Sequence, residues 1–499
     1  MPPPPLVVIG AGLAGLATGC YARLNGYTTR IFEHHSQPGG VVAAWRRGDY
    51  LIDGGIHFLI GYRPGQPIYE LYRELGIAPT LRAVPMETYV SFLDERSGRA
   101  LAVTADLDRL EADLKQASPA ASAVIAEILE GARRFATHGL GTLEMGRPAE
   151  LTGPLDRLRS FWAMRHVLRY FSGWYALPVS DYVQRRTGDP WLRWVLPNLF
   201  LPEVPLWFIL MLLGEMAAGD LALPEGGSRE LVELLERRYR DLGGEVHYNT
   251  TVAEILVEGE RAVGVRLADG TIHRAAAVVS AADGRATLFG MLGGRYLDDQ
   301  LKMRYQHWPR FRPLVMINFG IRRRFTGEPW LRVLRLARPL RVAGRDVEDL
   351  AVRLFNYSDR FAPPGSTVVQ ASFETKWSFW NDLQAEDRAR YDAEKARVAA
   401  EVLSRLEPHY PGIGAAVEVT DVATPYTTWR YTLNDRGAFE GWLPTPEALM
   451  ATMPRTLPGL EGFAMAGQWV VPGGGVPPCL YSGRHAVEIL CRRDRRPFR

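Results

Sequence analysis

Three glycines and one acid near the start of the chain have the types and the spacing that phosphate and ribose binding require. Gly10, Gly12 and Gly15 form the pattern GxGxxG, and Glu33 follows 18 residues after the last of them. The first glycine permits a tight turn, the second lets the backbone approach a pyrophosphate, and the third lets a helix pack close to a strand. The acid is placed to accept hydrogen bonds from a ribose. Together these residues indicate a site for an adenine dinucleotide.

A strand–turn–helix–strand unit is needed to position these residues. The run from Leu6 to Ile9 is typical of a buried strand, and the stretch from Thr28 to Phe32 is typical of a second strand after an amphipathic helix. The N-terminus of such a helix offers unpaired N–H groups and a positive dipole end to phosphates. We therefore expect Ala11, Leu13 and Ala14 to line the site with the glycines. The acid argues against the 2′-phosphate of NADP and leaves FAD and NAD open.

Size and composition indicate a globular protein of two domains. The chain has 499 residues, of which 47% are hydrophobic and 23% charged. A net charge of +3 gives no reason to expect a nucleic-acid partner. The three cysteines, Cys20, Cys479 and Cys491, have no metal-binding spacing, so we expect neither a metal site nor disulfides. Composition leaves the oligomeric state open.

The chain has no segment that we expect to be exported or to span a membrane. The opening residues MPPPP lack the charged and apolar regions of a signal peptide, and no apolar run reaches about 20 residues. The nearest candidate, LWFILMLLG from Leu206 to Gly214, is either a buried helix or a helix that dips into a membrane surface. We expect a cytoplasmic protein that can touch the inner membrane face peripherally.

The pattern of strands and helices predicts an α/β protein built from interleaved segments. Residues 1–65, 222–290 and 425–499 combine strands, glycine-rich loops and helices, and we expect them to form a Rossmann-type domain with a parallel sheet and a small β-meander. Residues 66–221 and 291–424 would form an inserted α+β substrate-binding domain with a mixed sheet and helices. The first of these two blocks looks mostly helical.

Local signals predict several individual elements. Ser228 is a plausible N-cap for a helix from Arg229 to Leu242, and the apolar run from Ala277 to Ser280 is typical of a buried parallel strand. Helices are expected over 107–136 and 385–406. Four alternating runs between residues 313 and 374 predict strands of the second domain.

Six motifs, in order, resemble those of the phytoene desaturase branch of the flavin amine oxidase superfamily, which also holds carotenoid isomerases and retinol saturases. They are VVIGAGLAGL at 7–16, PGG at 38–40, LIDGGIHFL at 51–59, LPEGGSRELVELL at 223–235, VVSAADGRATLF at 278–289 and AGQWVVPGGGVPPCLYSGR at 466–484. The resemblance covers nearly the whole chain. Two positions depart from the family pattern: Val41 stands where an arginine is common, leaving Arg46 or Arg47 as the phosphate partner, and Gln468 replaces a common acid.

The resemblance implies tightly bound FAD and assigns residues to it. Beyond those already named, the implied FAD-binding residues are Gly39, Gly40, Gly55, Ile56, Val252, Gly467, Gln468, Gly474, Gly475 and Val476. A helix beginning near Ser482 would direct its N–H groups at the pyrimidine end of the flavin, where negative charge gathers on reduction.

The resemblance also implies hydride transfer at flavin N5 in a long apolar isoprenoid or lipid. Formation of a C=C bond, its reduction, and cis/trans isomerisation without net redox change would all use one apolar pocket. His57, in the GGIHFL segment, is the candidate catalytic acid–base residue.

Two further alternatives remain open. An amine oxidase would use a lysine near N5, and of the four lysines only Lys302 lies in a suitable region. A non-catalytic lipid escort would have lost FAD, which the intact glycine fingerprint argues against.

Overall fold

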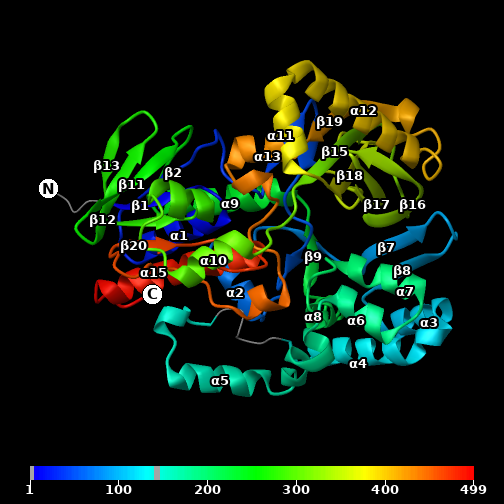
Figure 1. Ribbon diagram of the computed structural model, residues 1–499, viewed down its shortest axis with the longest axis horizontal. Helices are drawn as coiled ribbons and strands as arrows, with labels where there is room; N and C mark the ends of the chain where they lie inside the picture. Colours follow the sequence, from blue (N-terminus) through cyan, green and yellow to red (C-terminus); the bar gives the residue numbers. More distant parts are fainter. Residues whose placement is uncertain (1–4, 140–145) are drawn as a thin grey trace.

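Three separated stretches of the chain form a five-stranded parallel sheet that carries the glycine turn. The computed structural model describes residues 5–139 and 146–499 (Figure 1); the opening MPPP lies outside the described residues. The strand order is β10-β2-β1-β14-β20, and every pairing is parallel. The strands are β1 (Leu6–Ile9), β2 (Thr29–Phe32), β10 (Glu245–His247), β14 (Ala277–Ser280) and β20 (Phe463–Met465). The two strands expected from the first apolar runs, and the parallel strand expected at 277–280, are confirmed.

Side chains of β1 alternate between two cores, one on each face of this sheet. Leu6 and Val8 pack with helices α1 (Leu13–Leu24), α9 (Gly227–Asp241) and α15 (Val476–Arg493). Val7 and Ile9 pack on the other face with α10 (Asp299–His307) and the small antiparallel meander β11–β12–β13. The meander strands are β11 (Val252–Glu258), β12 (Arg261–Leu267) and β13 (Ile272–Arg274).

A second sheet of seven strands forms the other half of the molecule (Figure 1). Its order is β19-β15-β18-β17-β16-β7-β8, and only the β16–β7 pairing is parallel. The strands are β7 (Thr88–Asp94), β8 (Ala100–Thr104), β15 (Leu314–Ile321), β16 (Leu331–Val342), β17 (Arg345–Leu354), β18 (Thr367–Glu374) and β19 (Val417–Ala423). Helices α11 (Trp377–Glu386) and α12 (Arg388–Leu406) pack on it. The helix expected over 385–406 is confirmed as α12, which begins three residues later because Asp387 ends α11 and caps α12.

Helices gather at the end of this sheet around one apolar core. They are α3 (Leu107–Ala117), α4 (Ser122–His138), α6 (Val179–Arg186), α7 (Pro190–Val195) and α8 (Leu206–Ala217), with α2 (Pro67–Glu74) nearer the first sheet and α5 (Pro154–Met164) below (Figure 1). The helix expected over 107–136 is interrupted by a short 3-10 turn at Pro119–Ala121. Helix α8 is buried, so the buried alternative for the apolar run LWFILMLLG is confirmed and the membrane-surface alternative is wrong.

Short elements connect the two halves. They are β3 (Ala44–Arg47), β4 (Tyr50–Asp53), β5 (Leu59–Ile60), β6 (Ala83–Pro85), β9 (Leu221–Pro224), α13 (Pro425–Thr432) and α14 (Pro446–Met450). Strands β5, β9 and β6 form a small sheet of their own. In the described part of the chain, no helix has the length and apolar character to cross a bilayer.

The α/β fold with one parallel and one mixed sheet is confirmed. The strands of each large sheet come from the segments expected for its domain; the domain boundaries themselves stay a prediction. The block 66–221 is less helical than expected, because it contributes β7 and β8 to the mixed sheet.

Candidate functional site

In the glycine turn after β1, protein packing requires glycine at one position and would allow a larger residue at another. Gly10 has a φ of +96°, in the region that favours glycine. A Cβ on Gly15 would lie 1.9 Å from the carbonyl oxygen of Gly10, so the helix can approach the turn only without a side chain there. A Cβ on Gly12 would meet nothing nearer than 3.8 Å, at φ −71°. Protein packing therefore does not require glycine at position 12, and a bound group explains it better.

Glu33 connects the end of β2 to this turn. Its carboxylate accepts hydrogen bonds from the N–H of Ala11 at 2.6 Å and from the N–H of His35 at 2.8 Å. Burial raises the pKa of the Glu33 carboxyl, while these two hydrogen bonds act in the opposite direction. Because each carboxylate oxygen has two lone pairs, both can still accept a hydroxyl of a ligand.

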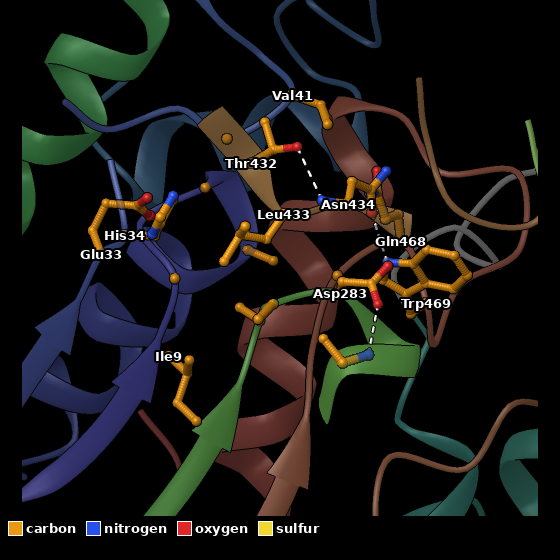
Figure 2. A pocket seen from close by; sticks show the side chains of 18 of the residues that line it. Ile9, Glu33, His34, Val41, Asp283, Thr432, Leu433, Asn434, Gln468 and Trp469 are labelled. Atoms are coloured by element: carbon orange, nitrogen blue, oxygen red, sulfur yellow. Dashed lines mark hydrogen bonds between the residues drawn. The ribbon is translucent and has the colours of Figure 1, made fainter. Parts of the chain in front are cut away.

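A cavity of about 940 Å³, counted with its open mouth, lies at the carboxyl ends of β1, β14 and β20 (Figure 2). Ligands of open parallel sheets bind at this edge. The sequence-predicted residues that line it are Gly10, Gly12, Leu13, Ala14, Glu33, Gly39, Gly40, Val252, Gly467 and Gln468. Figure 2 shows Glu33 and His34 at one end and Gln468 and Trp469 at the other. Helix α1 has no side-chain cap, so no side chain covers the N–H groups of its first turn.

Other sequence-predicted residues do not line this cavity. They are Ala11, Gly15, Gly55, Ile56, His57, Gly474, Gly475 and Val476. Ala11 and Gly15 act through the turn contacts described above. The remaining six belong to the segments at 55–57 and 474–476. Gly55 lies against Val42, which lines the cavity, and Gly475 directly precedes α15.

Asp283 is a cavity residue that the sequence reasoning missed. It follows β14, and its carboxylate accepts the N–H of Ala286 at 2.7 Å and that of Asp435 at 2.9 Å. Burial raises the pKa of this carboxyl to about 7. An acid three residues after a buried parallel strand is a signal that could have identified it. Thr432, Leu433 and Asn434, which also line the cavity, carry no comparable signal.

The segments LIDGGIHFL and LPEGGSREL meet through Asp53 and Ser228. Asp53 accepts the N–H and the hydroxyl of Ser228, both at 2.6 Å, and the Ser228 oxygen accepts the N–H of Ile56 at 2.8 Å. Ser228 therefore lies inside α9 and holds the loop at Gly55. The expectation that it is the N-cap is wrong, since α9 begins at Gly227 and has no side-chain cap.

A glycine-rich loop leads directly into α15. Gly473, Gly474 and Gly475 have φ values of +90°, +57° and +98°, so the chain here adopts a path that side chains disfavour. The helix begins at Val476, and the expectation of a start near Ser482 is wrong. Ser482 instead accepts the N–H of Gly467 at 2.7 Å and donates to the carbonyl of Cys479, which joins the helix to the loop after β20.

His57 and Glu440 border an interior hollow near this loop. Both side chains keep accessible surface although many protein atoms surround them, so this surface lies in a recess of the protein. His57 stacks on Phe439 with ring centroids 5.7 Å apart, and a Cβ on Gly474 would lie 3.0 Å from a Glu440 carboxylate oxygen. Cys479 is half-buried and lines the cavity, and burial together with the Glu440 carboxyl raises the pKa of its thiol.

Burial keeps both of these ionisable groups uncharged near neutral pH. It lowers the pKa of His57 to about 3, assisted by the nearby Arg353 guanidinium, and raises the pKa of Glu440 to about 8. The N–H of Gly475 donates to Glu440 and acts in the opposite direction on that carboxyl. At pH 7 His57 is therefore a neutral imidazole and Glu440 mostly a protonated acid.

Comparisons with known proteins agree with this geometry. Residues 13–491 match the model of the flavin containing amine oxidoreductase family. The chain belongs to this family. It is 26% identical over 97% of its length to a phytoene desaturase (neurosporene-forming) of Rhodobacter capsulatus, covering 93% of that protein. It is 23% identical over 96% of its length to the chloroplastic prolycopene isomerase of Arabidopsis thaliana, covering 81% of it. An oxidoreductase structure from Methanosarcina mazei shares the fold, with a TM-score of 0.63, 18% identity and 97% and 99% coverage of the two chains.

As a flavin-containing amine oxidoreductase, the chain is a flavoenzyme whose cofactor is FAD. The cavity fits such a cofactor in three respects. Gly12 leaves open backbone, Glu33 offers acceptors at one end, and the uncapped first turn of α1 offers N–H donors. The residue-by-residue assignment of FAD contacts stays a prediction.

Three basic candidates within this flavin-containing amine oxidoreductase lie elsewhere. Arg46 and Arg47 do not line the cavity; Arg47 pairs with Asp421 at 2.6 Å. Lys302 does not line it either, and pairs with Asp299 on the surface of α10. Neither alternative phosphate partner suggested by Val41 lines the cavity, and the choice of a phosphate partner stays a prediction. In the described residues, no group of His, Cys, Asp and Glu is arranged to hold a metal ion.

Proposed function

We propose that this flavoenzyme forms or reduces C=C bonds in a long apolar isoprenoid or lipid substrate. The phytoene desaturase from Rhodobacter capsulatus, which matches almost end to end, supports this substrate class. Bound FAD supplies a hydride acceptor or donor at its N5 atom.

The observation that carries the proposal is the uncharged state of two ionisable side chains beside the glycine-rich loop. His57 and Glu440, which both border it, are uncharged near pH 7 because burial disfavours their charged forms. An apolar chain that contacts these two side chains desolvates no charge on either of them, and the nearby Arg353 guanidinium is already held by the carbonyl of Ile56 and by Gln370. A charged substrate would find no ionised partner among these two groups.

The residues of the chain divide the work accordingly. A substrate that fills the hollow displaces water from it, which protects a hydride-transferring site from side reactions. Phe439 holds the His57 ring by stacking. The Asp53–Ser228 network fixes the backbone at Ile56, next to His57. Glu440 holds a proton at its carboxyl group, and this proton is available to the hollow.

A redox-neutral double-bond isomerase is the second candidate. The observation in its favour is the match to the prolycopene isomerase of Arabidopsis thaliana over 96% of the chain. Both activities need the same apolar hollow, so geometry does not separate them.

Anaerobic mixing of the purified holoenzyme with polyenes, retinoids and unsaturated fatty acids separates the candidates. Bleaching of oxidised FAD with a product two hydrogens lighter supports desaturation. Reoxidation of photoreduced FAD with a product two hydrogens heavier supports reduction of a double bond. A product of unchanged mass with FAD still reduced supports isomerisation. No response to any polyene, with peroxide released from small amines, would overturn the proposal.

A further inference from the structure

Helix α5 (Pro154–Met164) presents an apolar face to the solvent. Leu155 is 73% exposed, Leu158 54%, Phe161 59% and Trp162 61%. The other large apolar side chains that are exposed in the described residues are single positions on separate elements. Scattered exposed apolar residues are normal, whereas a contiguous patch marks an interaction site.

Helical geometry places these four side chains together. At about 100° per residue they fall within an arc of about 120°. Arg157 lies just beyond one edge of the arc and Arg159 just beyond the other. Asp156, the one acid of the helix, lies opposite and accepts the N–H of Gly153. The helix therefore has an apolar stripe bordered by positive charge, which is the pattern of helices that lie in a membrane interface.

Nothing in the described part of the chain buries the stripe, and Figure 1 shows α5 at the lower edge of the molecule. The side of α5 away from the stripe is half-buried at Asp156, Ser160 and Met164, and Met164 packs against the apolar core of the helical block. A helix of 11 residues is marginal in water without a surface to pack against. The stripe accordingly needs an external partner.

We propose that α5 docks the enzyme on an anionic lipid surface, with its stripe in the boundary between headgroups and acyl chains. Charge selects lipid over a second copy of the chain, because two α5 stripes face to face would bring Arg157 and Arg159 of each copy near those of the other. Anionic headgroups instead meet these guanidinium groups with the opposite charge. The inference rests on the proposed function, since an apolar substrate is collected from a membrane.

Vesicle flotation of the holoenzyme tests the docking. Vesicles of phosphatidylcholine alone are compared with vesicles containing one quarter phosphatidylglycerol. We expect binding to the anionic vesicles, and a loss of about tenfold or more in the double variant Leu158→Ser/Phe161→Ser, which removes two large side chains from the interface. The variant Arg157→Gln/Arg159→Gln is expected to lose the preference for anionic lipid. A matched control, Ile272→Ser/Met303→Ser, changes side chains that are 48% and 54% exposed elsewhere and should bind as the wild type does.

Two readouts keep the outcomes separate. Flavin absorbance and circular dichroism verify that each variant is folded, and activity on detergent-dispersed substrate should be unchanged in the α5 variants. Equal flotation of wild type and Leu158→Ser/Phe161→Ser would overturn the docking, as would a concentration-dependent dimer in light scattering that this variant abolishes. Docking without turnover of any polyene would instead overturn the proposed function alone.

Discussion

The Glu33 carboxylate accepts the N–H of Ala11 at 2.6 Å, so the end of β2 is tied to the glycine turn that follows β1. One side chain thus shapes the turn and lines the cavity beside it. A residue with both roles affects stability and cofactor affinity together, whereas a residue with one role affects only one of them. Melting temperature and FAD affinity, measured on the same variants, therefore distinguish the two kinds of residue.

Replacement of Glu33 by alanine is expected to lower both the stability of the protein and its affinity for FAD. The substitution leaves the N–H groups of Ala11 and His35 without their acceptor. Each hydrogen bond to a charged group contributes about 1.5–3 kcal/mol to the free energy of unfolding. We expect a lower melting temperature of the apoprotein and at least about tenfold weaker FAD binding, which corresponds to about 1.4 kcal/mol. Thermal melts and FAD titration measure the two effects. Glu33→Gln, which keeps one acceptor, should be intermediate, and an unchanged Glu33→Ala would contradict the assignment.

The glycines at 12 and 15 should respond differently to the same substitution. Gly15→Ala places a Cβ 1.9 Å from a backbone oxygen, and we expect it to cost about 3 kcal/mol of stability through overpacking. Gly12→Ala meets no such contact, so the apoprotein should melt within a few degrees of the wild type. Its FAD affinity should nevertheless fall by about tenfold or more, because a methyl group would intrude on the pyrophosphate. Equal effects on melting would show that the two glycines are not distinguished as described.

Much of the parallel sheet could be predicted from the sequence because its signals are local. The apolar run from Ala277 to Ser280 and the fingerprint around Gly10 require no knowledge of distant partners. Strands β7 and β8 carry a local hairpin pattern around Gly98 that the prediction did not use, whereas the pairing of β7 with β16, with Arg332 beside Ser91, depends on a distant segment. Ser228 was misassigned for the same reason: its partner, Asp53, is far away in sequence.

The cavity residues follow the same rule. Glu33 and the glycines belong to one local motif, and the cavity contains them. Asn434 lines the cavity and follows Leu433, which has a φ of +55°. A positive φ at a leucine cannot be predicted from its residue type. Glu440 lies in the segment GAFEGW, where a carboxyl among apolar neighbours gives no indication that it faces a hollow.

Loss of the Ser228 hydroxyl is expected to weaken the loop that carries His57. Ser228→Ala leaves the buried N–H of Ile56 without an acceptor and removes one donor to Asp53, at an expected cost of about 1–3 kcal/mol. Chemical denaturation measures this change. Ser404→Ala is the matched control, because Ser404 is exposed on α12 and bonds only within that helix. A cost no larger than that of the control would contradict the structural role of Ser228.

Replacement of His57 is expected to change activity only modestly. Its pKa of about 3 keeps the imidazole neutral across the physiological range, so it cannot exchange a proton in turnover as a titrating acid–base group does. We expect His57→Gln to retain kcat within about tenfold, whereas loss of a general acid or base typically costs about 100-fold or more. Steady-state kinetics from pH 5 to 8 should give profiles of the same shape for both proteins. A limb of the wild-type profile that disappears in the variant would restore a catalytic role.

The Glu440 carboxyl should make the protein less stable as pH rises. Its folded-state pKa is raised to about 8, so between about 4.5 and 8 the folded state holds a proton that the unfolded state has released. Because the folded state binds more protons there, stability falls with increasing pH and the loss levels off above about pH 8. Glu440→Gln carries no such charge. The melting temperature of Glu440→Gln minus that of the wild type should therefore increase from pH 5 to 8 and stay constant above pH 8. Glu87→Gln, at an exposed position, should show no trend, and a constant difference between wild type and Glu440→Gln would mean that the carboxyl is ionised at neutral pH.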